Sequence, residues 1–438
     1  MTSFWAPRAW IGDAVADGVR VTASEGLITS VETETVPDTA DERLRGLVLP
    51  GAVNAHSHAF HRLLRGRTHG DGGSFWTWRE LMYREAGRLD PASYERVATG
   101  VYAEMVAAGW TTVAEFHYMH HAPDARPYDP PHAMERALAR AARASGIRLT
   151  LLDTCYLSSG FGAPLEAAQR RFGDTDAATW LARLAALRDV FAAEHPEVVV
   201  GAAVHSVRAV PVEALERIGA ELDPAIPLHV HLSEQPGENA ACLEATGLTP
   251  TGLLARSGLL SSRLSAVHAT HLTDDDVAAL GDARATIVMC PTTEADLGDG
   301  VGPARRLADA GARLALGTDQ HAVVDPLLEA RALEHGERLA SGRRGRFSPA
   351  ELVAALTRGG AAAVGRPVGR IAVGEPCDLL VVDETSARTV GSDPGQLVLS
   401  ATAHDVTRVI IGGHERAVGG AHATLGDVGD LLRKAMTP

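Results

Sequence analysis

Eight apolar, β-rich runs, each followed by a segment with helical spacing, constrain the fold of this chain more than any other feature. The strand candidates are residues 47–54, 111–116, 148–154, 198–204, 227–231, 264–268, 286–290 and 313–318. The segments between them repeat apolar residues at intervals of three and four, as helices do. Eight strand–helix units in about 315 residues predict an α/β fold with a (β/α)8 barrel rather than an open doubly wound sheet. No glycine-rich dinucleotide fingerprint follows the first strand, which weakens the open-sheet alternative further.

The two ends of the chain follow a different pattern. Residues 1 to 46 and residues from about 370 to 415 alternate apolar and polar side chains around turn signals, which predicts half-buried antiparallel strands. We therefore expect a small β-sandwich domain built from residues 1–46 and 367–438, the second part with a C-terminal helix. The barrel is expected between them, over residues 47–366.

Composition excludes several classes of protein. The formal net charge is −14, and the one basic cluster, Arg343-Arg344-Arg346, is short, so we expect no nucleic-acid partner. No signal peptide and no apolar run of membrane-spanning length is found, which predicts a cytoplasmic protein without a membrane partner. The four cysteines stand far apart without CxxC spacing, so neither a disulfide framework nor a cysteine-rich zinc site is indicated.

Lysine occurs once, at Lys434 near the C-terminus. This excludes a Walker loop, which places its lysine on phosphates, and it argues against a Schiff-base lysine. It also argues against a two-metal site bridged by a modified lysine. Any metal site in the barrel is therefore expected to hold one ion.

Histidine and carboxylate side chains recur where the predicted barrel strands end. They are His56 and His58 after the first strand, Glu115, His117 and Tyr118 after the second, His205 and Arg208 after the fourth, His229, His231 and Glu234 at the fifth, His268 and His271 at the sixth, and Asp319 and His321 after the eighth. The carboxyl ends of barrel strands meet at one face, where active sites of such barrels lie. Residues two apart in a strand share a face, so the histidine pairs can each converge on one point.

These strand-end residues predict a metal site. His56, His58, His231 and Asp319 would make a shell of three imidazoles and one carboxylate with room for a water. Such ligands suit Zn²⁺, and Fe²⁺ or Mn²⁺ are alternatives. His229 shares a strand face with His231 and is the alternative ligand; we favour His231 because it is closer to the strand end.

Three residues are candidates for acid–base chemistry at this metal. Water on a catalytic zinc has a pKa of about 7, and His268 and Asp319 are placed to orient that water and take its proton. Glu234 follows His231 by three residues, where it can move a proton between the water and a leaving group. The alternative for Glu234 is a supporting role in which it only orients His231.

Several segments resemble a known family. HSHAF, HVHLSE, VHATH and GTDQH resemble the metal and catalytic segments of the amidohydrolase superfamily, whose members combine such a barrel with a split β domain. More narrowly, the chain resembles the formimidoylglutamate deiminases. The segments that carry this resemblance are SFWTWRELMYR (74–84), AEFHYMHH (114–121), GFG (160–162), QRRF (169–172), HSVRAV (205–210) and TEADLGDG (293–300). That family hydrolyses N-formimino-L-glutamate to N-formyl-L-glutamate and ammonia in histidine degradation. The resemblance covers residues from about 47 to 385.

The resemblance implies roles for individual residues. It implies the metal ligands His56, His58, His231 and Asp319, the acid–base groups His268 and Glu234, and the substrate contacts His61, Arg79, Tyr118, His205 and Arg208. A small dianionic substrate fits, because two arginines can each bind one carboxylate bidentately. The chain departs from the family pattern at His61, where glutamine is frequent, and at Asp296, where asparagine is usual.

Two alternatives stay open at this point. Another deaminase of the superfamily would act on a purine, pyrimidine or aminotriazine ring, and its pocket should favour aromatic stacking over paired arginines. A non-catalytic metal-binding scaffold is an alternative from another class, against which the combination of Glu234, His268 and Asp319 argues. We also expect a homodimer.

Overall fold

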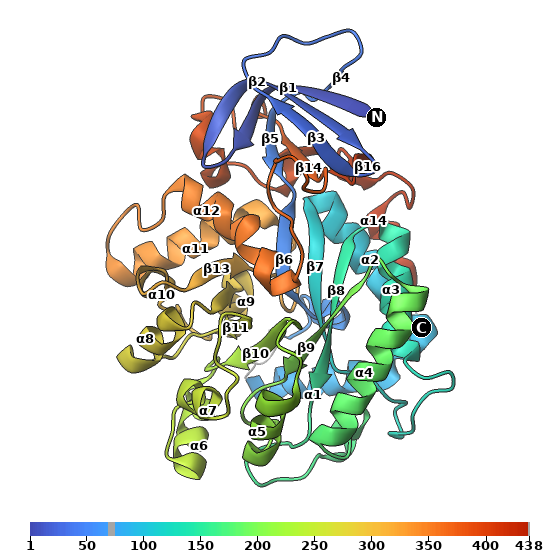
Figure 1. Ribbon diagram of the computed structural model, residues 1–438, viewed down its shortest axis with the longest axis vertical. Coiled ribbons are helices and arrows are strands. Elements are labelled where there is room, and N and C mark those ends of the chain that lie inside the picture. The colour runs from blue at the N-terminus through green and yellow to red at the C-terminus, as the bar shows by residue number, and fades with distance from the viewer. Residues whose placement is uncertain (69–74, 437–438) are drawn as a thin grey trace.

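A closed barrel of eight parallel strands forms the centre of the computed structural model, which describes residues 1–68 and 75–436 (Figure 1). The strands are β6 (Ala52–Ser57), β7 (Trp110–His117), β8 (Arg148–Cys155), β9 (Val199–Val204), β10 (Leu228–Leu232), β11 (Leu264–His268), β12 (Thr286–Met289) and β13 (Arg313–Leu316). They pair in chain order, and β13 closes on β6 through Leu316 and Asn54. The predicted barrel is confirmed.

Helices connect the strands and surround the barrel (Figure 1). They are α1 (Phe75–Arg88), α2 (Pro91–Ala108), α3 (Ala133–Ser145), α4 (Ala177–Glu194), α5 (Val212–Glu221), α6 (Pro236–Thr246), α7 (Pro250–Arg256), α8 (Asp274–Asp282), α9 (Pro291–Leu297), α10 (Ala304–Asp309), α11 (Pro326–Ser341), α12 (Pro349–Leu356), α13 (Ala361–Val364) and α14 (Val428–Met436). The main hydrophobic core includes the fully buried Trp110 of β7, Tyr102 of α2 and Trp180 of α4. No helix in the described ranges is long and apolar enough to cross a membrane.

The two chain ends build one mixed sheet of nine strands, which caps the barrel (Figure 1). Its strands are β1 (Thr2–Ile11), β2 (Ala14–Ser24), β3 (Leu27–Glu32), β4 (Glu42–Arg43), β5 (Leu47–Pro50), β14 (Leu379–Val382), β15 (Val406–Ile411), β16 (His414–Val418) and β17 (Ala421–His422). At its centre, β5 pairs in parallel with β1 and antiparallel with β14, so N- and C-terminal segments lie side by side. The expected association of the chain ends is confirmed, and the domain boundaries at residues 46 and 366 stay predictions.

The single strand predicted over residues 47–54 is wrong in one respect, because the structure divides it at Gly51. The part before Gly51 is β5 of the end sheet, and the part after it is β6 of the barrel. A Cβ atom at Gly51 would lie 2.3 Å from Oγ1 of Thr111, so only glycine fits where the chain passes between the two sheets. The Pro50-Gly51 pair is a turn signal and could have predicted that the strand divides at Gly51.

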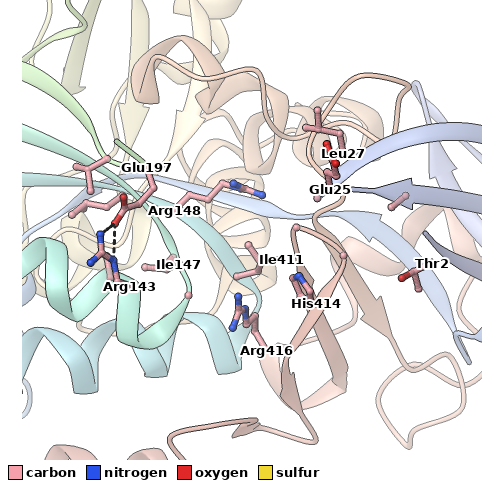
Figure 2. A pocket seen from close by; sticks show the side chains of 18 of the residues that line it. Thr2, Glu25, Leu27, Arg143, Ile147, Arg148, Glu197, Ile411, His414 and Arg416 are labelled. Atoms are coloured by element: carbon pink, nitrogen blue, oxygen red, sulfur yellow. Dashed lines mark hydrogen bonds and ion pairs between the residues drawn. The ribbon is translucent and has the colours of Figure 1, made fainter. Parts of the chain in front are cut away.

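A partly buried ion pair joins the end sheet to the amino end of the barrel. Arg148 at the start of β8 donates two hydrogen bonds to Asp378, over 2.7 and 2.9 Å, and Asp378 also accepts the backbone N–H of Gly412. A cleft of about 620 Å³ lies beside this contact, with the Arg143–Glu197 pair on one side and Arg416 on the other (Figure 2). Since Arg148 starts β8, this cleft is at the opposite end of the strand from the candidate site.

Candidate active site

Four side chains converge at the carboxyl ends of β6, β10 and β13. His56 and His58 come from β6 and the residue after it, His231 from β10, and Asp319 from the loop after β13; one ligand atom from each lies within 4.8 Å of the others. Nε2 of His231 is 3.2 Å from Nε2 of His56 and 3.3 Å from Nε2 of His58. Oδ1 of Asp319 is 3.3 Å and 3.5 Å from the same two histidine nitrogens.

Hydrogen bonds fix the tautomers of two of these histidines, His58 and His231. Nδ1 of His58 donates to the carbonyl of Phe116 over 2.8 Å, and Nδ1 of His231 donates to the carbonyl of His205 over 2.9 Å. The Nε2 atoms therefore carry lone pairs that face one another and a carboxylate oxygen. Burial lowers the pKa of His56, His58 and His231 well below the usual value, so the rings are neutral. The arrangement is that of a site for a divalent metal ion, which such nitrogen and oxygen donors bind.

The structure separates His231 from its alternative, His229. Nε2 of His229 donates to the carbonyl of Ala363 over 2.8 Å, and His229 is not part of the four-residue cluster. Both histidines are buried in the same strand. The one nearer the strand end is the one that reaches the other ligand atoms.

His268 and Glu234 adjoin this cluster. Nε2 of His268 lies 3.8 Å from Oδ2 of Asp319 and 3.9 Å from Oε1 of Glu234, while its Nδ1 lies 3.4 Å from Oε1 of Glu294. Burial disfavours the imidazolium, but these carboxylates outweigh burial and raise the pKa of His268 to about 10. Burial also raises the pKa of Glu234. The arrangement provides two groups that can exchange protons beside the metal site.

The five residues implied as substrate contacts all line one cavity together with residues of the metal site. The lining residues are His58, His61, Trp78, Arg79, Met82, Tyr83, Tyr118, Tyr156, Phe172, His205, Arg208, His231, Glu234, His268, Leu297 and Asp319. Burial lowers the pKa of His205 well below its usual value, and His231 and the charges of Arg208 and Arg79 lower it further, so the ring is neutral. The cavity therefore combines a metal site with two cations.

The candidate contacts are held by further hydrogen bonds. Arg79 donates to the Tyr83 hydroxyl over 2.7 Å, and Arg208 donates to the carbonyl of Ser159 over 3.1 Å. Nε2 of His61 lies 3.0 Å from the hydroxyl of Tyr118. Burial lowers the pKa of His61 to about 3, so the ring is neutral, and its buried Nδ1 has no hydrogen-bond partner among the described residues. His61 can therefore offer one ring nitrogen to a ligand.

Asp296, the second departure from the family pattern, helps to hold Trp78, which lines the cavity, through Gln320. Its carboxylate accepts Nε2–H of Gln320 over 2.7 Å, which turns the Gln320 carbonyl oxygen toward Trp78. Nε1 of Trp78 donates to that oxygen over 2.9 Å. An aspartate can only accept here, so it fixes the amide orientation that holds α1 to the loop after β13.

Sequence reasoning missed several cavity residues, although signals for some were present. Tyr156 lies two residues after the predicted strand 148–154 and directly after β8, so the strand-end rule applied there would have found it. Tyr83 lies four residues after Arg79 and therefore on the same helix face. Phe172 comes from a short 3-10 helix far from any strand end, and only the family resemblance of its segment pointed to it.

Two residues expected at the end of the second strand lie within β7 and outside the cavity. Glu115 and His117 point from β7 toward the helices: His117 stacks on Tyr94 of α2, and its Nε2 lies 3.3 Å from the Glu135 carboxylate of α3. His117, His120 and Glu135 form a second group of ligand-type atoms in the described residues. The Arg183 guanidinium, which also pairs with Asp153 and Asp174, lies 3.2 Å from Nδ1 of His120 and 3.7 Å from Glu135, so a cation already adjoins this group.

A closed parallel barrel with a three-histidine, one-aspartate cluster at its strand ends defines a metal-binding barrel protein. Comparison with known proteins narrows this class. A model of the amidohydrolase family matches residues 47–416. A formimidoylglutamate deiminase of Pseudomonas aeruginosa is 40% identical over 407 residues, covering 90% of this chain and 87% of the relative. An 8-oxoguanine deaminase of the same species is 30% identical over 392 residues, covering 86% and 83%.

Solved structures agree with this match. The crystal structure of an amidohydrolase from Brucella melitensis superposes with a TM-score of 0.93 at 32% identity, covering 100% of this chain and 99% of that one. An adenosine deaminase from Xanthomonas campestris with bound zinc superposes with a TM-score of 0.84 at 25% identity, covering 99% and 96%. The chain belongs to the amidohydrolase family.

The two buried histidines of β10 allow a matched test of the metal site. Replacing His231 with alanine removes a ligand, and we expect metal affinity to fall more than about 100-fold, beyond the usual effect of changing a residue behind a ligand. Replacing His229 with alanine should leave affinity within a few-fold of wild type. Bound metal is counted by atomic emission after dialysis against a graded chelator. Equal losses in both variants would contradict the assignment.

Proposed function

We propose that this protein is a metal-dependent deiminase that hydrolyses N-formimino-L-glutamate to N-formyl-L-glutamate and ammonia, as a step in histidine degradation. The observation that carries the proposal is a single cavity lined by residues of the metal site and by Arg79 and Arg208. A relative that shares 40% of its residues over 90% of this chain bears the name of this activity. The arginines supply the charge that a dianionic substrate requires.

We propose one Zn²⁺ ion, held by His56, His58, His231 and Asp319. Three imidazole nitrogens and one carboxylate suit zinc, and the related adenosine deaminase contains it. The cluster offers four ligands, and the chain's one lysine, Lys434, lies in α14, so a lysine-bridged second ion is not expected. The ion, when bound, lowers the pKa of a bound water and so supplies a nucleophile at neutral pH.

The surrounding side chains move the protons. His268, whose raised pKa keeps its ring protonated, orients the attacking water, and Asp319 accepts the proton, since both lie beside the same position. A carbon–oxygen bond forms at the formimino carbon, and the bond from that carbon to the terminal nitrogen breaks. Glu234 delivers a proton to the departing nitrogen, which leaves as ammonia. Its raised pKa suits this donor role, because a buried carboxyl retains its proton nearer to neutral pH.

The remaining contacts position the substrate. Arg208 and Arg79 each bind one carboxylate, since both arginines line the cavity. Tyr118 and His205 provide further polar atoms. His61 takes the place of the glutamine that is frequent in this family, and its partnerless Nδ1 is the atom available for a substrate oxygen or amide.

A second candidate function is deamination of a heterocycle. The cavity contains aromatic rings from Trp78, Tyr118, Tyr156 and Phe172, and an 8-oxoguanine deaminase is 30% identical to this chain. A flat neutral ring carries no carboxylates for the Arg79 and Arg208 guanidinium groups of the cavity to bind. This difference in charge favours the dianionic substrate.

We also propose a cytoplasmic location, which the four free and buried cysteines support, since thiols persist in reducing compartments. The small dianionic substrate is the partner we propose. The homodimer stays a prediction.

The substrate assignment is tested by comparing ammonia release from two substrate classes. Zinc-loaded protein should release ammonia from N-formimino-L-glutamate with a kcat/KM at least about 100-fold above that for 8-oxoguanine, guanine or cytosine, because only the first substrate pairs with both arginines. Ammonia is followed with a coupled glutamate dehydrogenase assay. Comparable turnover of a ring substrate would replace this proposal with the second candidate.

Replacing Arg208 with alanine tests the carboxylate contact. Loss of an ionic contact made equally in the ground and transition states raises KM with little change in kcat, and we expect a KM increase of about 10- to 100-fold. Replacing Arg188, a half-exposed arginine paired with Asp223 away from the cavity, is the control and should change neither value. An unchanged KM in the Arg208 variant would remove this residue from the substrate site.

A further inference from the structure

Glu115 of β7 binds the two residues that flank His58. Its Oε1 accepts the backbone N–H of Ala59 over 2.7 Å, and its Oε2 accepts the hydroxyl of Ser57 over 2.7 Å. The Tyr94 hydroxyl of α2 lies 3.5 Å from Oε1. Glu115 is fully buried and reaches these partners from the helix side of the barrel, without lining the cavity.

The contact with Ala59 completes a helix start that His58 cannot cap by itself. His58 is the N-cap residue of the 3-10 helix at Ala59–Leu64, and its side chain makes no capping hydrogen bond. Its ring is already committed, with Nδ1 on the Phe116 carbonyl and Nε2 on the metal cluster. The first N–H groups of a helix need acceptors, and Glu115 supplies one from the neighbouring strand.

The contact with Ser57 continues as a chain of buried hydrogen bonds to the other metal-ligating segment. The Ser57 hydroxyl lies 3.3 Å from Nε2 of His321, and Nδ1 of His321 lies 3.0 Å from the hydroxyl of Thr318. Asn54 of β6 donates to that hydroxyl over 2.7 Å. Thr318 and His321 stand on either side of Asp319, so the chain spans the seam between the first and last barrel strands.

When Glu115 is ionised, each bond in this chain has one possible direction; burial raises the pKa of Glu115 to about 7, so this applies above neutral pH. The carbonyl oxygen of Asn54 accepts the backbone N–H groups of Thr318 (3.1 Å) and His56 (3.3 Å), so its amide nitrogen donates to the Thr318 hydroxyl. Thr318 must then donate to Nδ1 of His321, whose Nε2–H donates to Ser57. The Ser57 hydroxyl donates its hydrogen bond to the Glu115 carboxylate, which can only accept. The carboxylate therefore fixes the orientation of every donor before it.

The loop that carries Asp319 and His321, at the other end of this series of hydrogen bonds, needs this support. Asp319 and His321 have φ values of +42° and +59°, in the left-handed region that residues other than glycine rarely adopt. Such backbone persists only where the surroundings fix it. Here the backbone N–H of His58 donates to the Asp319 carbonyl over 3.1 Å, while His321 is held through its ring by Thr318 and Ser57.

We infer that Glu115 is a positioning residue for the metal site, which holds His58 through Ala59 and Ser57 and holds the Asp319 loop through Ser57 and His321. The inference rests on the metal site of the proposed function. It assigns an effect on metal affinity to a residue that lies outside the cavity.

Glutamine cannot replace Glu115 in this arrangement. If its amide nitrogen faced Ala59, two N–H groups would meet. If its amide nitrogen faced Ser57, the serine hydroxyl would have to donate to His321, and His321 would have to donate to Thr318. The Thr318 hydroxyl would then face two donors, His321 and Asn54, with no acceptor for its own proton.

The test compares metal affinity in three variants of the full-length protein: Glu115→Gln, Ser57→Ala and Glu334→Gln. Glu334 is the matched control, since it is a fully buried carboxylate that accepts the backbone N–H groups of Arg346 (3.1 Å) and Phe347 (2.7 Å), none of which lines the cavity. The dissociation constant for Zn²⁺ is measured by competition with a chromophoric chelator, without an activity assay, and thermal unfolding is recorded for each variant.

We expect Glu115→Gln to raise the dissociation constant for Zn²⁺ about 10- to 100-fold, as changes behind metal ligands do, and Ser57→Ala to raise it severalfold. Glu334→Gln should lower the unfolding temperature and leave the dissociation constant within twofold of wild type.

The inference is overturned if Glu115→Gln binds Zn²⁺ within twofold of wild type, or if Glu334→Gln weakens binding as much. If Glu115→Gln does not fold, Ser57→Ala decides, and an unchanged constant there overturns the inference. Wild-type protein that binds Zn²⁺ without releasing ammonia would contradict the proposed function and leave this inference standing.

Discussion

Three neutral imidazole nitrogens and one carboxylate oxygen face each other at 3.2 to 3.5 Å in a buried site, and the rest of the active site depends on this convergence. Their lone pairs repel one another unless a cation lies between them. The fold maintains the convergence through the Nδ1 bonds of His58 and His231 to backbone carbonyls. The candidate metal site is therefore built mainly on the strand ends of the barrel.

Closure of the barrel and assembly of the site take place at the same seam. β13 pairs with β6 at Asn54, and the bridge between Ser57 and Asp319 extends this pairing to the metal ligands. The bonds that hold the first strand to the last one thus also set the distance from His56 and His58 to Asp319. This explains why strained backbone at Asp319 persists where the barrel closes.

Much of the fold and the metal cluster could be predicted from sequence, because both follow from one periodic rule. Parallel barrel strands end at one face, so residues far apart in sequence, such as His56 and Asp319, meet there. The rule does not say which neighbour along a strand faces the cavity. Glu115 and His117 were singled out with Tyr118, yet alternation along β7 turns the first two toward the helices. Tyr83 and Phe172 come from helices, whose approach to the cavity depends on packing that the sequence pattern does not encode.

The central claim is that one bound metal ion converts this cavity into a deiminase site. Metal-free protein titrated with Zn²⁺ tests it most directly, with bound metal and ammonia release from N-formimino-L-glutamate measured in the same samples. The account predicts a rate that rises in proportion to bound Zn²⁺ and stops rising at one ion per chain. A rate that is independent of metal, or one that continues to rise toward two ions per chain, would contradict it.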